Sequence, residues 1–442
     1  MKIIRQAEYE TLRAHLAARS VALDVELMKR VGAIIDDVRA RGDRALIEYA
    51  ARFDNVELTP SELRIDVDRL RRFAEKVDER VVQSLREAIR NVRAFHERQI
   101  EESWIMNAMP GVELGQRIAP LERVGVYVPG GTAAYPSSVV MNVVPAQVAG
   151  VERIVVATPP RTLAETPAVA AALLELNVRE VYAVGGAQAI AALAFGTETV
   201  PRVDKITGPG NKYVAAAKKL VFGVVGIDAI AGPTEVVIVA DETASAEFIA
   251  ADLLAQAEHG EDASSILITT SESLAATVAE ELERQLATLP RREIATASLK
   301  EYGAIILVQN LERACGMVDE LAPEHVEIVT RDDDSVAAKI NHAGAIFFGP
   351  YTPEAVGDYL AGPNHVLPTG RTARFSSALG VYDFVKRTSL LRYSEAAFSA
   401  VADSVAVLAE AEGLGGHARS ALIRKTVSRK DAKKDAKTQK NL

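Results

Sequence analysis

Residues 235–260 read EVVIVADETASAEFIAADLLAQAEHG, a β-branched run followed directly by an Ala-rich segment with helical periodicity. A short run of this kind is typical of a strand buried on both faces, and the segment after it is typical of the helix that covers such a strand. Similar apolar runs, several of them ending in Gly or Pro, recur along the chain at RVGVYVPGG (123–131), RIVVATPP (153–160), EVYAVGGAQAIAALAFG (180–196), SSILITT (264–270), GAIILVQN (303–310), HVEIVT (325–330) and GAIFFGP (344–350).

Strands that alternate with helices predict an α/β protein with largely parallel sheets. The strands are too numerous for one mononucleotide-type half, so we expect two α/β units with a boundary near residues 231–235. We predict five parts in chain order. Residues 1–118 form a helical N-terminal region that packs on the second α/β unit, residues 119–234 form the first unit, and residues 235–370 form the second. Residues 371–426 form a C-terminal segment with one last helix, and residues 427–442 form a basic disordered tail.

The composition narrows the class of protein. The chain has 442 residues, a formal net charge of -9 and 48% hydrophobic residues, so we expect small-molecule ligands and no nucleic-acid or membrane partner. Cys315 is the single cysteine, which excludes an intrachain disulfide and favours a reducing compartment. No signal peptide or spanning segment is apparent, and the cytoplasm is the expected location.

Three places in the chain offer metal ligands. Gln256 and His259 in QAEHG are three positions apart on a predicted helix and can reach one ion, although a helix-end His can also act as a dipole cap. Asp358, in a Gly-rich turn region that also holds His365, can complete a metal shell or cap the turn. Glu412 and His417 in EGLGGH flank a Gly-rich link that is equally typical of a helix end, so these patterns together indicate a mononuclear site only weakly.

An adjacent carboxylate and imidazole, Glu324 and His325, stand immediately before a predicted strand in APEHVEIVT. Two titratable groups of different basicity suit a reaction that moves protons in both directions, and loop edges of α/β folds are where such groups act. An ordinary surface pair at the start of a strand would have the same sequence. Both interpretations stay open at this point.

Glycine clusters follow predicted strands at PGG (129–131), VGGAQ (184–188) and TGPGNKY (207–213). Such positions let backbone amides approach a phosphate. The dinucleotide fingerprint is not met, because Tyr213 stands where its third glycine is required after Gly208 and Gly210. Any NAD site therefore departs from the usual pattern.

Together these segments resemble the histidinol dehydrogenase family, in order along the chain. The matching stretches, spread over residues 21–424, are RVGVYVPGGTAAYPSSVVMNVVPA, VGGAQAIAALAFGT, VDKITGPGNKYV, AGPTEVVIVAD, DLLAQAEHG, LAPEHVEI, NHAGAIFFG, GDYLAGPNHVLPT and EGLGGH. The resemblance implies oxidation of L-histidinol to L-histidine through L-histidinal, with two NAD and one zinc ion per active site. It also implies two Rossmann-like three-layer α/β/α units, as in aldehyde dehydrogenases, and a homodimer whose C-terminal segment crosses to complete the partner's site.

Carried over by motif, the resemblance assigns a role to each candidate residue. The zinc ligands would be Gln256, His259, Asp358 and His417, the acid–base pair Glu324 and His325, and the NAD contacts Tyr127, Gln188 and Asn211. The substrate pocket would hold Thr234, Glu412 and His365 together with the ligands and the acid–base pair. Thr234 often corresponds to Ser in the family, so the hydroxyl is kept and a methyl is added.

In the mechanism that this resemblance implies, His325 accepts the proton of the substrate hydroxyl while a hydride is transferred from the substrate to the first NAD. Cys315 lies outside every matching motif, so we expect Glu324, and no thiolate, to activate water for the aldehyde step, with His325 deprotonating the gem-diol. Three alternatives remain: a related zinc and NAD dehydrogenase for another small alcohol such as a sulfonated diol, a zinc hydrolase with the same ligands, and a non-catalytic NAD-responsive module.

Overall fold

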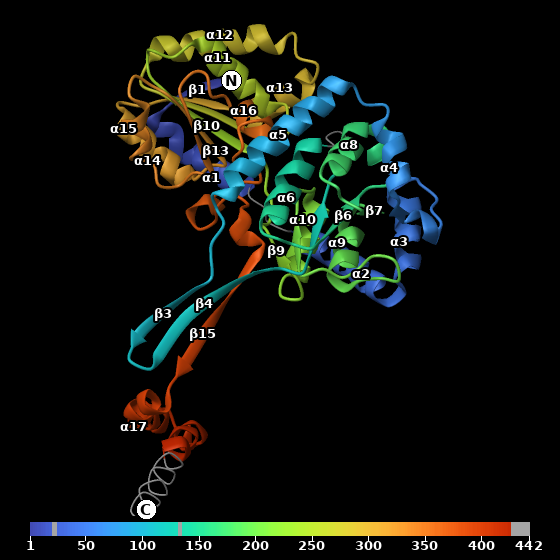
Figure 1. Ribbon diagram of the computed structural model, residues 1–442. Coiled ribbons are helices and arrows are strands. Elements are labelled where there is room, and N and C mark those ends of the chain that lie inside the picture. Colours follow the sequence, from blue (N-terminus) through green and yellow to red (C-terminus); the bar gives the residue numbers. More distant parts are fainter. Residues whose placement is uncertain (20–23, 131–134, 426–442) are drawn as a thin grey trace, which may run out of the picture. The chain divides into compact units, whose positions relative to one another are not determined.

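The computed structural model of the protein describes residues 1–19, 24–130 and 135–425 (Figure 1). They form two compact units, which we call the body (residues 1–100 and 120–384) and the arm (residues 101–119 and 385–425). The tail expected to be disordered, 427–442, lies outside the described residues. Among the described residues, no helix is both long enough and apolar enough to cross a lipid bilayer.

The body contains two six-stranded sheets, which confirms the predicted α/β class. The first sheet has the order β2-β7-β6-β5-β8-β9 and is parallel except where β2 meets β7. Its strands are β2 (Arg64–Ile65), β5 (Arg123–Tyr127), β6 (Arg153–Thr158), β7 (Glu180–Ala183), β8 (Lys205–Thr207) and β9 (Gly226–Ile227).

The second sheet has the order β1-β12-β11-β10-β13-β14, and all its strands are parallel. Its strands are β1 (Lys2–Arg5), β10 (Glu235–Ala240), β11 (Ser264–Thr269), β12 (Ala304–Leu307), β13 (His325–Val329) and β14 (Ala345–Phe348). Every apolar run quoted above as a strand is present. The two-residue strands β2 and β9 escaped prediction because so few residues carry no measurable periodicity, whereas β8 is the strand expected before the glycine cluster at 207–213.

Helices cover both faces of each sheet, giving three layers in each case. Around the first sheet lie α2 (Val25–Arg41), α3 (Asp43–Tyr49), α4 (Val67–Ala74), α5 (Glu79–Glu97), α6 (Pro136–Val148), α7 (Thr162–Glu165), α8 (Pro167–Glu175), α9 (Gly186–Phe195) and α10 (Lys212–Val221). One face of the second sheet packs on α1 (Tyr9–Arg19), α14 (Leu311–Leu321) and α15 (Asp333–Ala337), the other on α11 (Ala246–Ala257), α12 (Glu272–Leu286) and α13 (Arg292–Tyr302). Single turns stand at η1 (Gln6–Glu8), η2 (Ala50–Asp54), η3 (Pro60–Glu62), η4 (Thr372–Arg374) and η5 (Val381–Asp383).

Residues 235–260 fold as their pattern predicts. The apolar residues of β10 are fully or almost fully buried, alternating between the two cores of the second sheet. Ser245 caps α11 by accepting a hydrogen bond from the Phe248 amide, and the helix ends at Ala257. The chain then turns so that His259 donates its amide to the Gln256 carbonyl, at 3.2 Å. This turn presents Gln256 and His259 to one region.

The N-terminal region differs from its expected packing on the second unit. Only β1 and α1 join the second sheet, whereas residues of α2 and α5 share a hydrophobic core with strands of the first sheet. An apolar helix stripe shows that a face is buried but carries no information about which sheet buries it. The domain limits drawn from the sequence stay a prediction.

The arm is a small unit in which β3 (Trp104–Met109), β4 (Val112–Pro120) and β15 (Val385–Tyr393) form a sheet of order β15-β4-β3. It also contains α17 (Glu395–Ala411) and a helical segment at 415–425. We expected 1–118 to be helical and the C-terminal segment to begin at 371, whereas β3 and β4 are strands and 371–384 belong to the body. The β4–β15 pairing joins segments far apart in the chain, which a local pattern does not reveal, whereas β3 and β4 form a hairpin of neighbouring strands that the sequence analysis missed.

Candidate active site

The candidate catalytic side chains gather at the amino-terminal edge of the second sheet. Thr234 immediately precedes β10, and Glu324 immediately precedes β13, whose first residue is His325. Parallel registration pairs Val236 with His325, so the beginnings of the two strands lie side by side. Ligand sites of open α/β sheets usually lie at the carboxyl ends of strands. Here the candidate residues lie at the opposite edge.

A chain of hydrogen bonds connects three of the predicted residues. The Gln256 Nε2 donates to Thr234 Oγ1 at 2.9 Å, and Thr234 Oγ1 donates to Glu324 Oε2 at 2.5 Å. Since the hydroxyl gives its proton to the carboxylate, it can only accept from the amide nitrogen. The Gln256 Oε1 is therefore directed away from Thr234; it is buried and has no hydrogen-bond partner within the described chain.

Glu324 is a buried carboxyl that also accepts a hydrogen bond from the Glu235 amide, at 3.2 Å. Burial raises the pKa of Glu324 to about 8, although the Thr234 hydroxyl and the Glu235 amide act in the opposite direction. A carboxyl with a pKa near the working pH is suited to exchange protons with water or substrate. The acid–base role expected for Glu324 stays a prediction.

His325 is held as a neutral base with a defined tautomer. Its Nδ1 lies 3.1 Å from the Glu235 carbonyl oxygen, which can only accept, so Nδ1 carries the proton and Nε2 the free lone pair. The Nε2 is buried and has no hydrogen-bond partner among the residues described. Burial lowers the pKa of His325 to about 3, and the neighbouring His259 and His365 act in the same direction.

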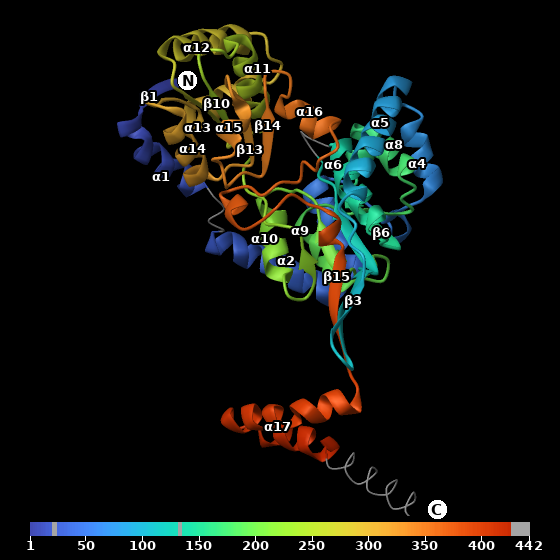
Figure 2. The same cartoon turned by 60° about the vertical axis from the view of Figure 1, so that its left-hand side comes forward.

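A cluster of metal-ligating atoms lies beside this pair. Donor atoms of His259, Glu354 and Asp358 all lie within 4.8 Å of one another, the last two from α16 (Glu354–Tyr359), which Figure 2 shows near α11. Imidazole nitrogen and carboxylate oxygen are ligands that zinc accepts, and the partnerless Gln256 Oε1 is a further oxygen donor. The residues present therefore fit a zinc ion.

Glu354 was not recognised in the sequence. It is 3% exposed, and its Oε1 lies 3.7 Å from His325 Nδ1 and 3.9 Å from His259 Nε2. Its spacing of four from Asp358 places both carboxylates on one helix face, a signal that was available in PEAVGDY. Burial and the neighbouring carboxylates, Asp358 first, raise the pKa of Glu354 well above its usual value.

Burial also acts on the two predicted ligands of this cluster. It raises the pKa of Asp358 to about 6, with His259 acting in the opposite direction, and it lowers the pKa of His259. Each of these pKa shifts arises because burial disfavours the charged form of the side chain. A cation bound among the three side chains would instead favour the ionised form of the carboxylate.

His365 reaches the same region on the loop that follows α16. Its imidazole contributes to lowering the pKa of both His259 and His325, and burial lowers the pKa of His365 itself to about 4. The His365 Nε2 has no hydrogen-bond partner in the described part of the chain. Beside it, Asn364 donates to the Met141 carbonyl of α6 at 2.7 Å. The loop thus ties the site to the helices of the first sheet. The ring of Tyr135, which immediately precedes α6, lies 6.4 Å from the His259 ring in a tilted arrangement.

The three predicted NAD contacts lie at the carboxyl edge of the first sheet. Tyr127 ends β5 and accepts a hydrogen bond from the Gly186 amide at 3.0 Å, Gln188 lies in the first turn of α9, and Asn211 caps α10. Gly208 allows this packing, because a Cβ there would lie 2.1 Å from the Tyr127 carbonyl oxygen. A helix N-terminus beside a strand end is a ready site for phosphate.

Glu412 and His417 lie in the arm, where Glu412 caps the end of α17 and His417 is on the helical segment that follows. Both are exposed. The other candidate residues all belong to the body, and these two belong to the arm.

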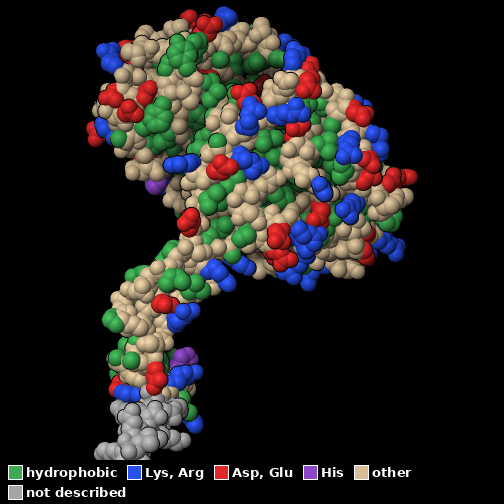
Figure 3. Space-filling model, in the orientation of Figure 1, with side chains coloured by type: hydrophobic (Ala, Val, Ile, Leu, Met, Phe, Trp, Pro, Cys, Tyr) green, Lys and Arg blue, Asp and Glu red, His purple; other side chains and the backbone are tan. Residues whose placement is uncertain are grey.

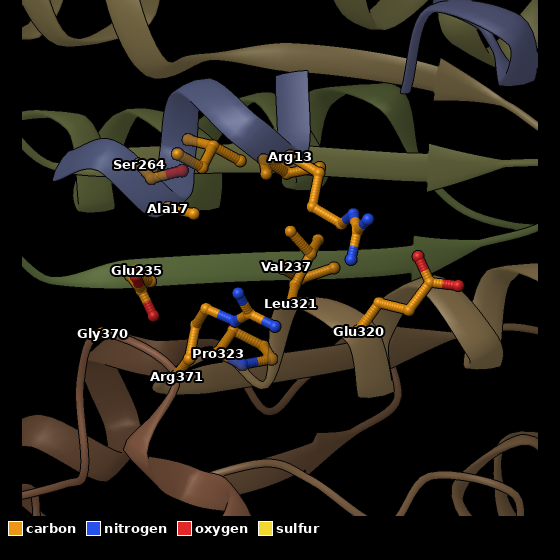
Figure 4. Close-up of a pocket in the computed structure, with 12 residues that line it drawn as sticks. Arg13, Ala17, Glu235, Val237, Ser264, Glu320, Leu321, Pro323, Gly370 and Arg371 are labelled. Carbon is orange, nitrogen blue, oxygen red and sulfur yellow. The ribbon is translucent and has the colours of Figure 1, made fainter. Parts of the chain in front are cut away.

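A separate small hollow opens beside α1, β10 and β11 (Figure 4). Glu235 and Val237 line it, and side chains alternate along β10, so it faces the α1 and α14 side of the sheet. His325 is in register with Val236, whose side chain belongs to the core on the α11 side. The hollow and the catalytic side chains therefore lie on opposite faces.

Comparison with known proteins gives one consistent result. The family model for histidinol dehydrogenase matches residues 4–425. A curated histidinol dehydrogenase of Halalkalibacterium halodurans is 55% identical over 395 residues, covering 89% of this chain and 93% of the relative. That of Bacillus subtilis is 52% identical over 421 residues, covering 95% and 97%.

A solved structure agrees with these sequence matches. The crystal structure of histidinol dehydrogenase from Elizabethkingia anophelis superposes with a TM-score of 0.90 at 34% identity, covering 97% of this chain and 99% of that one.

Proposed function

This chain belongs to the histidinol dehydrogenase family and oxidises histidinol with NAD in histidine biosynthesis, and from that premise we propose which of its residues carry out the reaction. The matched relatives do not favour the alternative of another small alcohol. The main support is that the oriented imidazole of His325, the buried carboxyl of Glu324 and the cluster of metal-donor atoms lie together at one edge of the second sheet. A cytoplasmic location stays a prediction.

In the proposed mechanism, His325 Nε2 accepts the proton of the substrate hydroxyl, because the other ring nitrogen is occupied by the Glu235 carbonyl. NAD, when bound, would supply the acceptor for the hydride that leaves the same carbon in each oxidation. Glu324, ionised, then accepts a proton from water so that the water can add to the aldehyde. Cys315 is buried on α14, in the hydrophobic core on the other face of the second sheet. Burial raises the pKa of its thiol, which supports the expectation that it is inert.

We assign the zinc site to Gln256, His259, Asp358 and His417 of the partner subunit. The support is the partnerless Gln256 oxygen and the close approach of His259 and Asp358. Zinc would bind and orient the amino alcohol beside the nicotinamide. Tyr127, Gln188 and Asn211 would bind NAD, while Thr234, His365 and the partner's Glu412 would contact histidinol.

Replacing His259 by Ala should raise the zinc dissociation constant at least about 100-fold, beyond the usual effect of outer-shell residues. Zinc content per subunit after dialysis, measured by atomic absorption, checks this. His15→Ala is the matched control, because His15 is half-exposed and stacks on Tyr302 outside the cluster. Full zinc retention by His259→Ala would remove the metal assignment.

A shared site requires a dimer, and the arm supports one. Figure 3 shows hydrophobic side chains on the surface of the arm. The large apolar side chains that its small Ala-lined core leaves exposed are Trp104, Ile105, Met106, Met109, Leu391, Val407, Leu408 and Ile423. Apolar surface of this extent marks an interface. We therefore propose a homodimer in which the arm of one subunit completes the site of the other.

Mixing two inactive variants tests this sharing. His417→Ala and His325→Asn subunits, co-refolded in equal amounts, should regain about one quarter of the wild-type sites, since half the dimers are mixed and each carries one intact site. Histidinol oxidation followed by NADH absorbance measures the recovery. Complementation cannot occur if each site is built from one chain, so activity equal to the mean of the two parents would contradict the proposal.

A further inference from the structure

A buried carboxyl group, Glu327, and a partly buried one, Asp252, lie directly behind the proposed machinery and outside it. Glu327, 2% exposed, follows His325 by two positions on β13 and so points to the same face of the sheet. Asp252 lies on α11, which packs on that face, and its carboxyl is hydrogen-bonded to the carboxyl of Glu327. The Glu327 Oε1 also accepts the backbone amide of Glu354 at 2.8 Å.

These contacts join the three elements that carry the site. Asp252 precedes Gln256 by one helical turn on α11, Glu327 shares β13 with His325, and the Glu354 amide belongs to the first residue of α16, which carries Asp358. The first amides of a helix have no partner inside the helix, so Glu327 supplies one. The position of α16 relative to α11 therefore depends on this junction.

We propose that Asp252 and Glu327 form a positioning pair that holds α11, β13 and α16 in register and thereby sets the affinity of the metal site. The inference rests on the zinc site proposed above. Neither residue belongs to the cluster of donor atoms formed by His259, Glu354 and Asp358. They act through the backbone and helix that present those donors.

The chemistry of the pair defines its test. Two carboxyl groups can share a hydrogen bond only when one of them holds a proton, and burial raises the pKa of Glu327 to about 8 and that of Asp252 to about 6. A protonated Glu327 accepts through its carbonyl oxygen and donates through its hydroxyl. A glutamine amide accepts and donates in the same two directions, whereas a methionine of similar length does neither.

The experiment compares Glu327→Gln with Glu327→Met, and Asp252→Asn with Asp252→Ala, in the full-length enzyme. Each apoprotein is titrated with Zn²⁺ against a chromophoric chelator, and the visible spectrum of the Co²⁺ form reports the geometry of the donors. We expect the amide variants to stay within about threefold of wild type and Glu327→Met to lose about 10- to 100-fold in zinc affinity, with a changed Co²⁺ spectrum. Asp252→Ala should lose less, because Glu327 still holds the Glu354 amide.

Asp241→Ala is the matched control for losing a buried carboxylate. Asp241 is 6% exposed and accepts the amides of Thr243 and Arg331 at 2.9 and 2.8 Å, at the opposite end of β10. Its loss should lower the melting temperature and leave zinc affinity unchanged. If Glu327→Met does not fold, the Asp252 variants decide, since Asp252 is only partly buried.

The outcomes separate this inference from the proposed function. Wild-type zinc affinity in both Glu327→Met and Asp252→Ala, with zinc lost in His259→Ala, would overturn the positioning pair alone. Zinc retained in His259→Ala would overturn the metal site itself. Equal losses in the amide and apolar variants would also contradict the pair, because the hydrogen bonds would then be irrelevant.

Discussion

A Glu324→Gln enzyme will oxidise histidinal about 10²- to 10⁴-fold more slowly than the wild type while keeping most of its rate of histidinol oxidation. Only the aldehyde step needs a base that accepts a proton from water, and an amide cannot serve. The Gln oxygen can still accept from the Thr234 hydroxyl and the Glu235 amide, so the local geometry is kept. Single-turnover NADH formation from each substrate separately measures the two steps, and equal losses would contradict the division of labour.

The pH profile is the control for this prediction. Since burial raises the pKa of Glu324 to about 8, its carboxyl is protonated below that pH and cannot act as a base. Aldehyde oxidation by the wild type should therefore rise with pH through about 8, and that rise should be missing in Glu324→Gln. The pKa of His325 is lowered to about 3, so this residue stays neutral throughout this range and adds no further pH dependence to the rate.

A His325→Asn enzyme will lose about 10²- to 10⁴-fold in kcat for both oxidations, because both need the proton acceptor at Nε2. Asn can still donate to the Glu235 carbonyl from the position of Nδ1, so the substitution removes the base and keeps its anchor. Steady-state kinetics with histidinol and with histidinal check this, together with zinc content.

The matched control is His342→Asn, the same substitution at a partly buried histidine whose amide is held by Asp319 on α14. It should leave kcat and zinc content unchanged. A loss confined to one of the two oxidations in His325→Asn would contradict the assignment of one base to both, and a loss of zinc would show that the substitution disturbs the metal site.

Much of the fold follows from local pattern. The run at 235–240 is strand and the Ala-rich segment after it is helix, because both depend on neighbouring residues along the chain. The same holds for the other strands of the second sheet except β1. The packing of α2 and α5 on the first sheet and the pairing of β4 with β15 depend on distant partners, and these were not anticipated.

The motifs along the chain were sufficient to assign the family and to name the candidate ligands and bases, since each motif is contiguous and survives in the linear order of residues. Folding added the relations among them: the tautomer of His325, the direction of the Gln256 amide, Glu354 within the cluster, and the Asp252–Glu327 pair behind it. These relations arise because parallel pairing of β10 with β13 brings together residues about 90 positions apart, as in the Thr234–Glu324 hydrogen bond. Contacts over that separation leave no periodic trace in a single sequence, so they become visible only when the strands are in register.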